Sequence, residues 1–119
     1  MRVTHFLREA AQYAADIRLN QTYRIAAVGL RDDGAVVHAT NKAVRCKSPS
    51  PKRLWDTHAE TRICRKIDVG SVIFVSRVLC DGTWANARPC EGCRACLESW
   101  GVRKAYYTIA PGEFGVMVF

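Results

Sequence analysis

Two short motifs in this chain carry residue types that bind metal ions. Thr57-His58-Ala59-Glu60 supplies an imidazole and a carboxylate, and Arg88-Pro89-Cys90-Glu91-Gly92-Cys93 supplies two thiols. Cys90 and Cys93 are three residues apart, so on one helical turn both sulfurs can reach one ion. One histidine and two cysteines leave a fourth coordination position open, which marks a catalytic zinc site rather than a structural one. Glu60, two residues past His58, can point into the same pocket without binding the metal.

The order and spacing of the two motifs resemble those of a known family. His58-Ala59-Glu60, a gap of 28 residues and Pro89-Cys90-Glu91-Gly92-Cys93 are similar to the H-x-E…P-C-x-x-C signature of the zinc-dependent cytidine/deoxycytidylate deaminase superfamily. The resemblance covers the chain from about Tyr23 to the C-terminus. It implies Zn²⁺ as cofactor, bound by His58, Cys90 and Cys93. It also implies that Glu60 is the catalytic acid and base, and that Ala59 lies in the substrate site.

Length and composition predict a single domain, residues 1–119, of ordinary globular character. The net charge of +7 and a pI near 9.4 favour anionic partners such as nucleotides or nucleic acid. No apolar run approaches the roughly 20 residues that span a bilayer, so we expect no membrane partner. The N-terminus does not resemble a signal peptide, because Arg8, Glu9 and Gln12 interrupt its apolar residues. The expected location is therefore cytoplasmic.

Six cysteines raise two further interpretations. Disulfides are disfavoured because no secretory signal is present, and the four cysteines outside the metal motif are expected to be small buried hydrophobic residues. These four are Cys46, Cys64, Cys80 and Cys96. Alternatively, Cys90, Cys93 and Cys96 resemble part of an iron–sulfur run. No fourth cysteine follows Cys96, and that interpretation leaves His58 and Glu60 unexplained.

Hydrophobic periodicity predicts helices alternating with strands, which indicates an α/β fold. The predicted helices are 4–19, 58–67 and the segment from Pro89 to Gly101; the predicted strands are 24–31, 35–40, 71–79, 103–110 and 114–119; residues 80–88 are predicted to form a loop. The apolar stripes expected on the three helices are Phe6, Ala10, Tyr13, Ala14 and Ile17; Ala59, Ile63 and Ile67; and Cys93, Leu97 and Trp100.

The last two predicted strands are joined through only four residues, 110–113, the first of which ends the earlier strand. Because a parallel pair needs a crossover connection, these strands should form an antiparallel hairpin. The resemblance implies a three-layer α/β/α cytidine deaminase-like sandwich whose mixed five-stranded sheet has the order 2-1-3-4-5. A C-terminal hairpin is similar to the free-nucleoside branch of the superfamily, whereas His58 stands where that branch typically has cysteine. The branch therefore stays open.

Several residues near the motifs are candidates for substrate contacts. Asn41 follows the second predicted strand, where the family's asparagine contacts the sugar, although asparagine is also common in turns. Lys42 and Arg45 belong to a basic loop, 42–56, that could hold a phosphate or could simply be a solvated loop. Trp84 could stack on a base, and Arg88 could reach a phosphate.

These residues predict hydrolytic deamination of a cytosine nucleotide, dCMP or CMP, to the uracil nucleotide and ammonia. Zinc would activate a water, and Glu60 would take its proton and pass it to the ring N3 and the leaving amine. The alternatives are a deaminase of free cytidine or deoxycytidine, a base deaminase of single-stranded nucleic acid, and a structural zinc domain. Glu60 argues against the last, because a structural site needs no such residue. The resemblance also implies a homo-oligomer.

Overall fold

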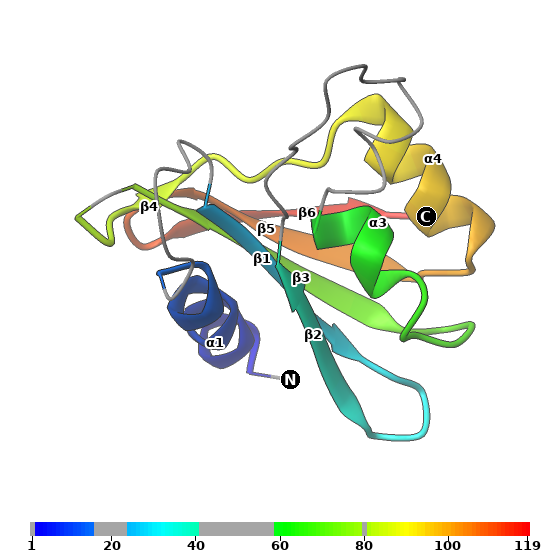
Figure 1. The fold of residues 1–119 in the computed structure, drawn as a ribbon. Coiled ribbons are helices and arrows are strands. Elements are labelled where there is room, and N and C mark those ends of the chain that lie inside the picture. Colours follow the sequence, from blue (N-terminus) through cyan, green and yellow to red (C-terminus); the bar gives the residue numbers. More distant parts are fainter. Residues whose placement is uncertain (1, 16–23, 41–58, 80) are drawn as a thin grey trace, which may run out of the picture.

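The computed structural model describes residues 2–15, 24–40, 59–79 and 81–119, and of Glu60 and Thr61 it describes the backbone alone. Helices and strands alternate in these ranges (Figure 1). The elements are α1 (Val3–Ala15), β1 (Arg24–Leu30), β2 (Val36–Thr40), α3 (Ala59–Ile63), β3 (Val72–Val78), β4 (Trp84–Ala85), α4 (Glu91–Ser99), β5 (Lys104–Ala110) and β6 (Glu113–Val118). The predicted α/β class is confirmed.

The strands form one mixed sheet in the order β2-β1-β3-β5-β6. Strand β1 is antiparallel to β2 and β3, β3 is parallel to β5, and β5 is antiparallel to β6. The five long strands have the predicted relative order, and the predicted C-terminal hairpin is present. The predicted number of strands is wrong, because the short strand β4 pairs with the end of β3 as a sixth member of the sheet. A two-residue strand is too short to produce a recognisable period in the sequence.

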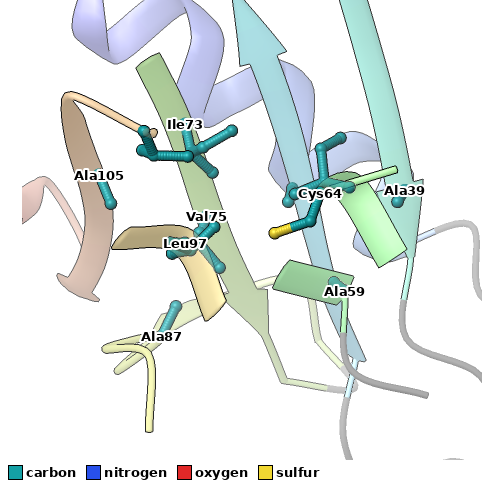
Figure 2. Packing of buried hydrophobic residues seen from close by; sticks show 11 residues of the cluster. Ala39, Ala59, Cys64, Ile73, Val75, Ala87, Leu97 and Ala105 are labelled. Atoms are coloured by element: carbon teal, nitrogen blue, oxygen red, sulfur yellow. The ribbon is translucent and has the colours of Figure 1, made fainter. Parts of the chain in front are cut away.

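The helices cover both faces of the sheet, as a three-layer sandwich requires. Helix α1 packs on one face, and α3 and α4 lie together on the other (Figure 1). Successive strand residues point to opposite faces. In β1, Ala27 belongs to the hydrophobic cluster under α3 and α4, and Val28 to the cluster under α1. Figure 2 shows the first cluster, with Leu97 of α4 over Val75 of β3.

The buried stripe of α1 differs from the predicted one. The helix buries Leu7, Ala10, Ala11 and Ala14. Phe6 and Tyr13 lie only partly buried at its margins, where their rings stack on Phe74 and His38 with centroids 4.8 and 4.0 Å apart. Three alanines in the stripe allow the helix backbone to approach the sheet closely, which displaces the larger rings to the sides. Predicted stripe residue Ile17 lies outside the described residues.

The other two helices are shorter than predicted, although their inner faces are largely correct. Helix α3 ends at Ile63, where the amide of Lys66 donates to the carbonyl oxygen of Ile63 at 2.8 Å in a tight turn. Trp100 was expected on the buried stripe of α4, but it is the C-cap residue and is 47% exposed. Gly101 follows with φ of 81° and ends the helix, as predicted. None of the helices in the described ranges combines the length and hydrophobicity needed to cross a membrane.

Candidate active site

Helices α3 and α4 bring the two motifs to the same face of the sheet. The two helices contact each other and share one hydrophobic cluster. His58 lies outside the described residues, immediately before the first residue of α3. Ala59 is fully buried in the shared cluster, and Glu60 follows it in the first turn of the helix. The side chain of Glu60 lies outside the described part of the structure, so its role stays a prediction.

The second motif forms the start of α4. Cys90 is the N-cap residue, has an extended backbone and is exposed, whereas Cys93 is fully buried one turn further along. The preceding segment is fixed by the amide of Ala87, which donates to the carbonyl oxygen of Thr108 in β5 at 2.8 Å. Ala87 also belongs to the cluster that contains Ala59 (Figure 2). The start of α3 and the segment that leads into α4 thus share a common core.

The donor set of these motifs fits zinc better than other common metals. Cysteine sulfur and histidine nitrogen are the preferred zinc ligands. Cys90 and Cys93 lie one turn apart on one rigid helix, as a shared ion requires. Within the described residues no three histidine, cysteine or acidic side chains converge, but His58 and the carboxylate of Glu60 are not among them. Cys90, Cys93 and His58 therefore remain the residues that could hold the ion.

A second pair of thiols lies deeper between the two helices. The Sγ atom of Cys96 in α4 donates to the Sγ atom of Cys64, just past α3, at 3.5 Å. Cys64 is buried in the shared cluster and Cys96 packs against it, so both are small core residues, as predicted. Cys46 and Cys80 lie outside the described residues. Although the fold brings Cys64 to Cys96, no three thiols meet in the described ranges, so the iron–sulfur interpretation gains no support.

The predicted substrate contacts do not all lie on this face. Asn41, Lys42 and Arg45 fall outside the described residues. Trp84 pairs with Val78 across β3 and β4, and directly paired residues share a face of the sheet. That face is the one covered by α1, where Trp84 packs on the core, so this position gives no support to its predicted stacking on a base, which stays a prediction. Because residues 80–88 were predicted to form a loop, the pairing of Trp84 with Val78 was not expected.

Arg88 lies in the extended segment that leads into α4. Its amide donates to the Oδ1 atom of Asn86 at 3.0 Å, and its side chain is exposed two residues before Cys90. Ala87 and Pro89 on either side are buried, which directs Arg88 outward. A contact between Arg88 and a substrate phosphate stays a prediction.

Sequence reasoning missed two cations, one in the last turn of α3 and one in the turn after it. The Nη1 atom of Arg62 donates to the carbonyl oxygen of Thr40 at 2.5 Å, and the Nζ atom of Lys66 donates to that of His38 at 2.7 Å. Both acceptors belong to β2. The only sequence signal was a pair of cations four residues apart next to the apolar stripe, and that pattern does not reveal its acceptor.

Two carboxyl groups in turns away from the motifs have a lowered pKa. The hydroxyl of Ser71 donates to Oδ1 of Asp68 at 2.8 Å and lowers the pKa of that carboxyl. The amide of Asp32, at 3.1 Å, and the Arg31 guanidinium, at 3.6 Å, lower this pKa further. Hydrogen bonds from Thr83 similarly lower the pKa of Asp81. The Asp68 contacts tie the β1–β2 turn to the segment before β3.

A comparison with solved structures identifies the architecture. The crystal structure of cytidine deaminase from Burkholderia pseudomallei superposes with a TM-score of 0.61 and 20% sequence identity, over 96% of this chain and 91% of that one. The chain has the fold of a cytidine deaminase. No protein-family model matches the sequence. No curated protein sequence matches it either.

Proposed function

We propose that this chain is a hydrolytic deaminase that converts a cytosine nucleotide, dCMP or CMP, to the uracil nucleotide and ammonia. One observation carries the proposal: α3 and α4, which begin at the two halves of the H-x-E…P-C-x-x-C pattern, lie together on one face of a cytidine deaminase fold. The fold alone would not define the chemistry. The residue types at these two helix starts do, because they combine metal ligands with one additional carboxylate.

His58, Cys90 and Cys93 would hold a zinc ion. When bound, zinc supplies Lewis-acid activation of water. Cys90 at the N-cap and Cys93 on the inner face of α4 are fixed by the helix itself, and the buried Ala87 and Pro89 fix the approach to that helix. Two of the three ligands are thiolates, which donate negative charge and weaken the ion as an acid. A strong base beside the ion is therefore needed.

Glu60 is the residue that would supply this base. Its carboxylate would accept the two protons of the attacking water in turn, and would deliver the first to ring N3 and the second to the departing amino group. One water is consumed and one ammonia leaves, so Glu60 ends each turnover in its starting state. A positioned acid–base group of this kind contributes about 10²- to 10⁴-fold to the rate.

Free cytidine or deoxycytidine is a second candidate substrate. The observation that favours it is the antiparallel β5–β6 hairpin, which resembles the nucleoside branch of the superfamily. The similar crystal structure is also that of a cytidine deaminase. The basic loop 42–56 favours a phosphorylated substrate instead. A direct substrate comparison decides between these two arguments.

The proposed function is tested with purified protein and a substrate panel. The panel contains cytidine, deoxycytidine, CMP, dCMP, dCTP and short single-stranded oligonucleotides, and ammonia release is measured. Turnover of monophosphates but not nucleosides supports the nucleotide assignment, and the reverse supports the second candidate. Activity on oligonucleotides alone would instead identify a base deaminase of single strands. No turnover of any cytosine compound would refute the proposal. Sedimentation of the same sample tests the expected homo-oligomer.

The role of Glu60 is tested by Glu60→Gln. We expect at least a 10²-fold loss of kcat, roughly the contribution of a general acid–base, with zinc content and thermal unfolding unchanged. Glu98→Gln, at an exposed position of α4, is the matched control and should retain activity. Retention of most activity by Glu60→Gln would contradict the assigned role.

A further inference from the structure

Arg62, in the last turn of α3, and Lys66, in the turn after it, take no part in the proposed chemistry. We propose that Arg62 is a positioning residue for the deamination, because it fastens α3, the helix that contains Glu60, to the end of β2. The inference rests on the proposed function. Its structural basis is the hydrogen bond from Nη1 of Arg62 to the carbonyl oxygen of Thr40, the last residue of β2, at 2.5 Å.

The two cations bind carbonyl groups of alternate residues in β2. Arg62 lies in the last turn of α3, and Lys66 lies in the turn that follows the helix. Their acceptors, Thr40 and His38, are alternate residues of β2 and lie about 7 Å apart along an extended strand. The carbonyl groups of alternate residues in an antiparallel strand point to the same side. Both side chains therefore bind the same side of β2.

A directional attachment adds to the packing that holds the short helix α3 on the sheet. It has five residues, too few to be stable as an isolated helix. Its inner face contributes Ala59 and Ile63 to the core. Apolar contact is non-directional, so it holds the helix on the sheet but resists rotation about the helix axis weakly. A charge-assisted hydrogen bond has a preferred angle, and Arg62 therefore fixes that rotation.

The two attachments differ in their distance from the proposed catalytic group. Arg62 is partly buried and two residues from Glu60, whereas Lys66 is exposed and six residues away. A rotation of α3 would move Glu60 relative to the residues of α4. Misplacement of a reacting group by about 1 Å can cost roughly 100-fold in rate. Loss of the Arg62 attachment should therefore lower kcat rather than weaken substrate binding.

The experiment compares Arg62→Gln with Lys66→Gln as the matched control, since each removes one bond from a cation to β2. Steady-state kinetics are measured on the best substrate of the wild-type protein and normalised to the folded fraction from circular dichroism. We expect Arg62→Gln to lower kcat roughly tenfold or more with KM changed less than about threefold. Lys66→Gln should stay within about twofold of wild type in both constants. Arg62→Lys should recover part of kcat, because an ammonium group can still donate to Thr40.

The outcomes separate this inference from the proposed function. If the wild-type protein deaminates no cytosine compound, both are wrong. If the wild-type protein is active and the two glutamine variants lose kcat equally, the role of Arg62 is structural and the inference is overturned, while the proposed function stands. A rise in KM at unchanged kcat would overturn it as well. A selective loss of kcat in Arg62→Gln, partly rescued in Arg62→Lys, supports it.

Discussion

The close packing around Gly29 of β1 gives a specific prediction about how α3 is held on the sheet. A Cβ atom at this position would lie 2.9 Å from Cγ2 of Ile67, 3.0 Å from Cγ2 of Val37 and 3.4 Å from Cγ1 of Ile63. The distance to Ile67 is shorter than Cβ contacts tolerate and the distance to Val37 is tight, and both methyl groups sit on branched carbons next to the main chain. Gly29→Ala must therefore displace α3 and its following turn from the sheet, or β2 from its place.

Two opposing contributions set the expected change in the free energy of unfolding of Gly29→Ala. Inserting a methyl group into a packed core costs about 1–3 kcal/mol. Replacing glycine in a strand regains roughly 0.5–1 kcal/mol of conformational entropy. The net destabilisation is about 1–2 kcal/mol, which for a chain of this size lowers Tm by roughly 5 °C.

Denaturant unfolding followed by circular dichroism measures this free energy directly. Ile67→Ala removes the methyl group at 2.9 Å, so Gly29→Ala should cost less in that background than in the wild type. Because the strain displaces the helix that contains Glu60, kcat should also fall for the folded fraction of Gly29→Ala. Equal or higher stability of the single variant, or a cost that Ile67→Ala does not reduce, would refute the close-packing argument.

Two further predictions concern turns. Gly101→Ala should destabilise the chain by about 1–3 kcal/mol, because φ is 81° and a Cβ would lie 3.1 Å from both methyl groups of Val69. Gly112→Ala, with φ of 76° and no atom within 4 Å of its Cβ, is the control for backbone strain alone and should cost less. The pKa of Asp68 is lowered in the folded state, so its contribution to stability is present above the ordinary value of 3.8 and is lost as the pH falls below it. Asp68→Asn should therefore reduce the stability lost on acidification below that pH, and an unchanged acid titration would contradict this reasoning.

The sequence alone determined the alternation of elements and the C-terminal hairpin. Both depend on local properties: the period of apolar residues, and a four-residue connection too short for a parallel crossover. The pattern that predicts a metal site is local as well, because Cys90 and Cys93 belong to one helical turn and the H-x-E residues are adjacent in sequence, and the site itself stays a prediction. The order of the five long strands came from the family resemblance, and the structure agrees with it.

Tertiary structure decided every feature that depends on which surfaces meet. Trp84 was read as a loop residue near the substrate, and only its pairing with Val78 places it on the α1 face. The acceptor of Arg62 is 22 residues away in sequence, so no local pattern could indicate it. In the sequence, Gly29 is one residue of an apolar strand. Only the folded structure shows that a side chain at this position would collide with Ile67. Such contacts are set by packing between elements distant in sequence, and packing, unlike periodicity, is a property of the assembled sheet and helices.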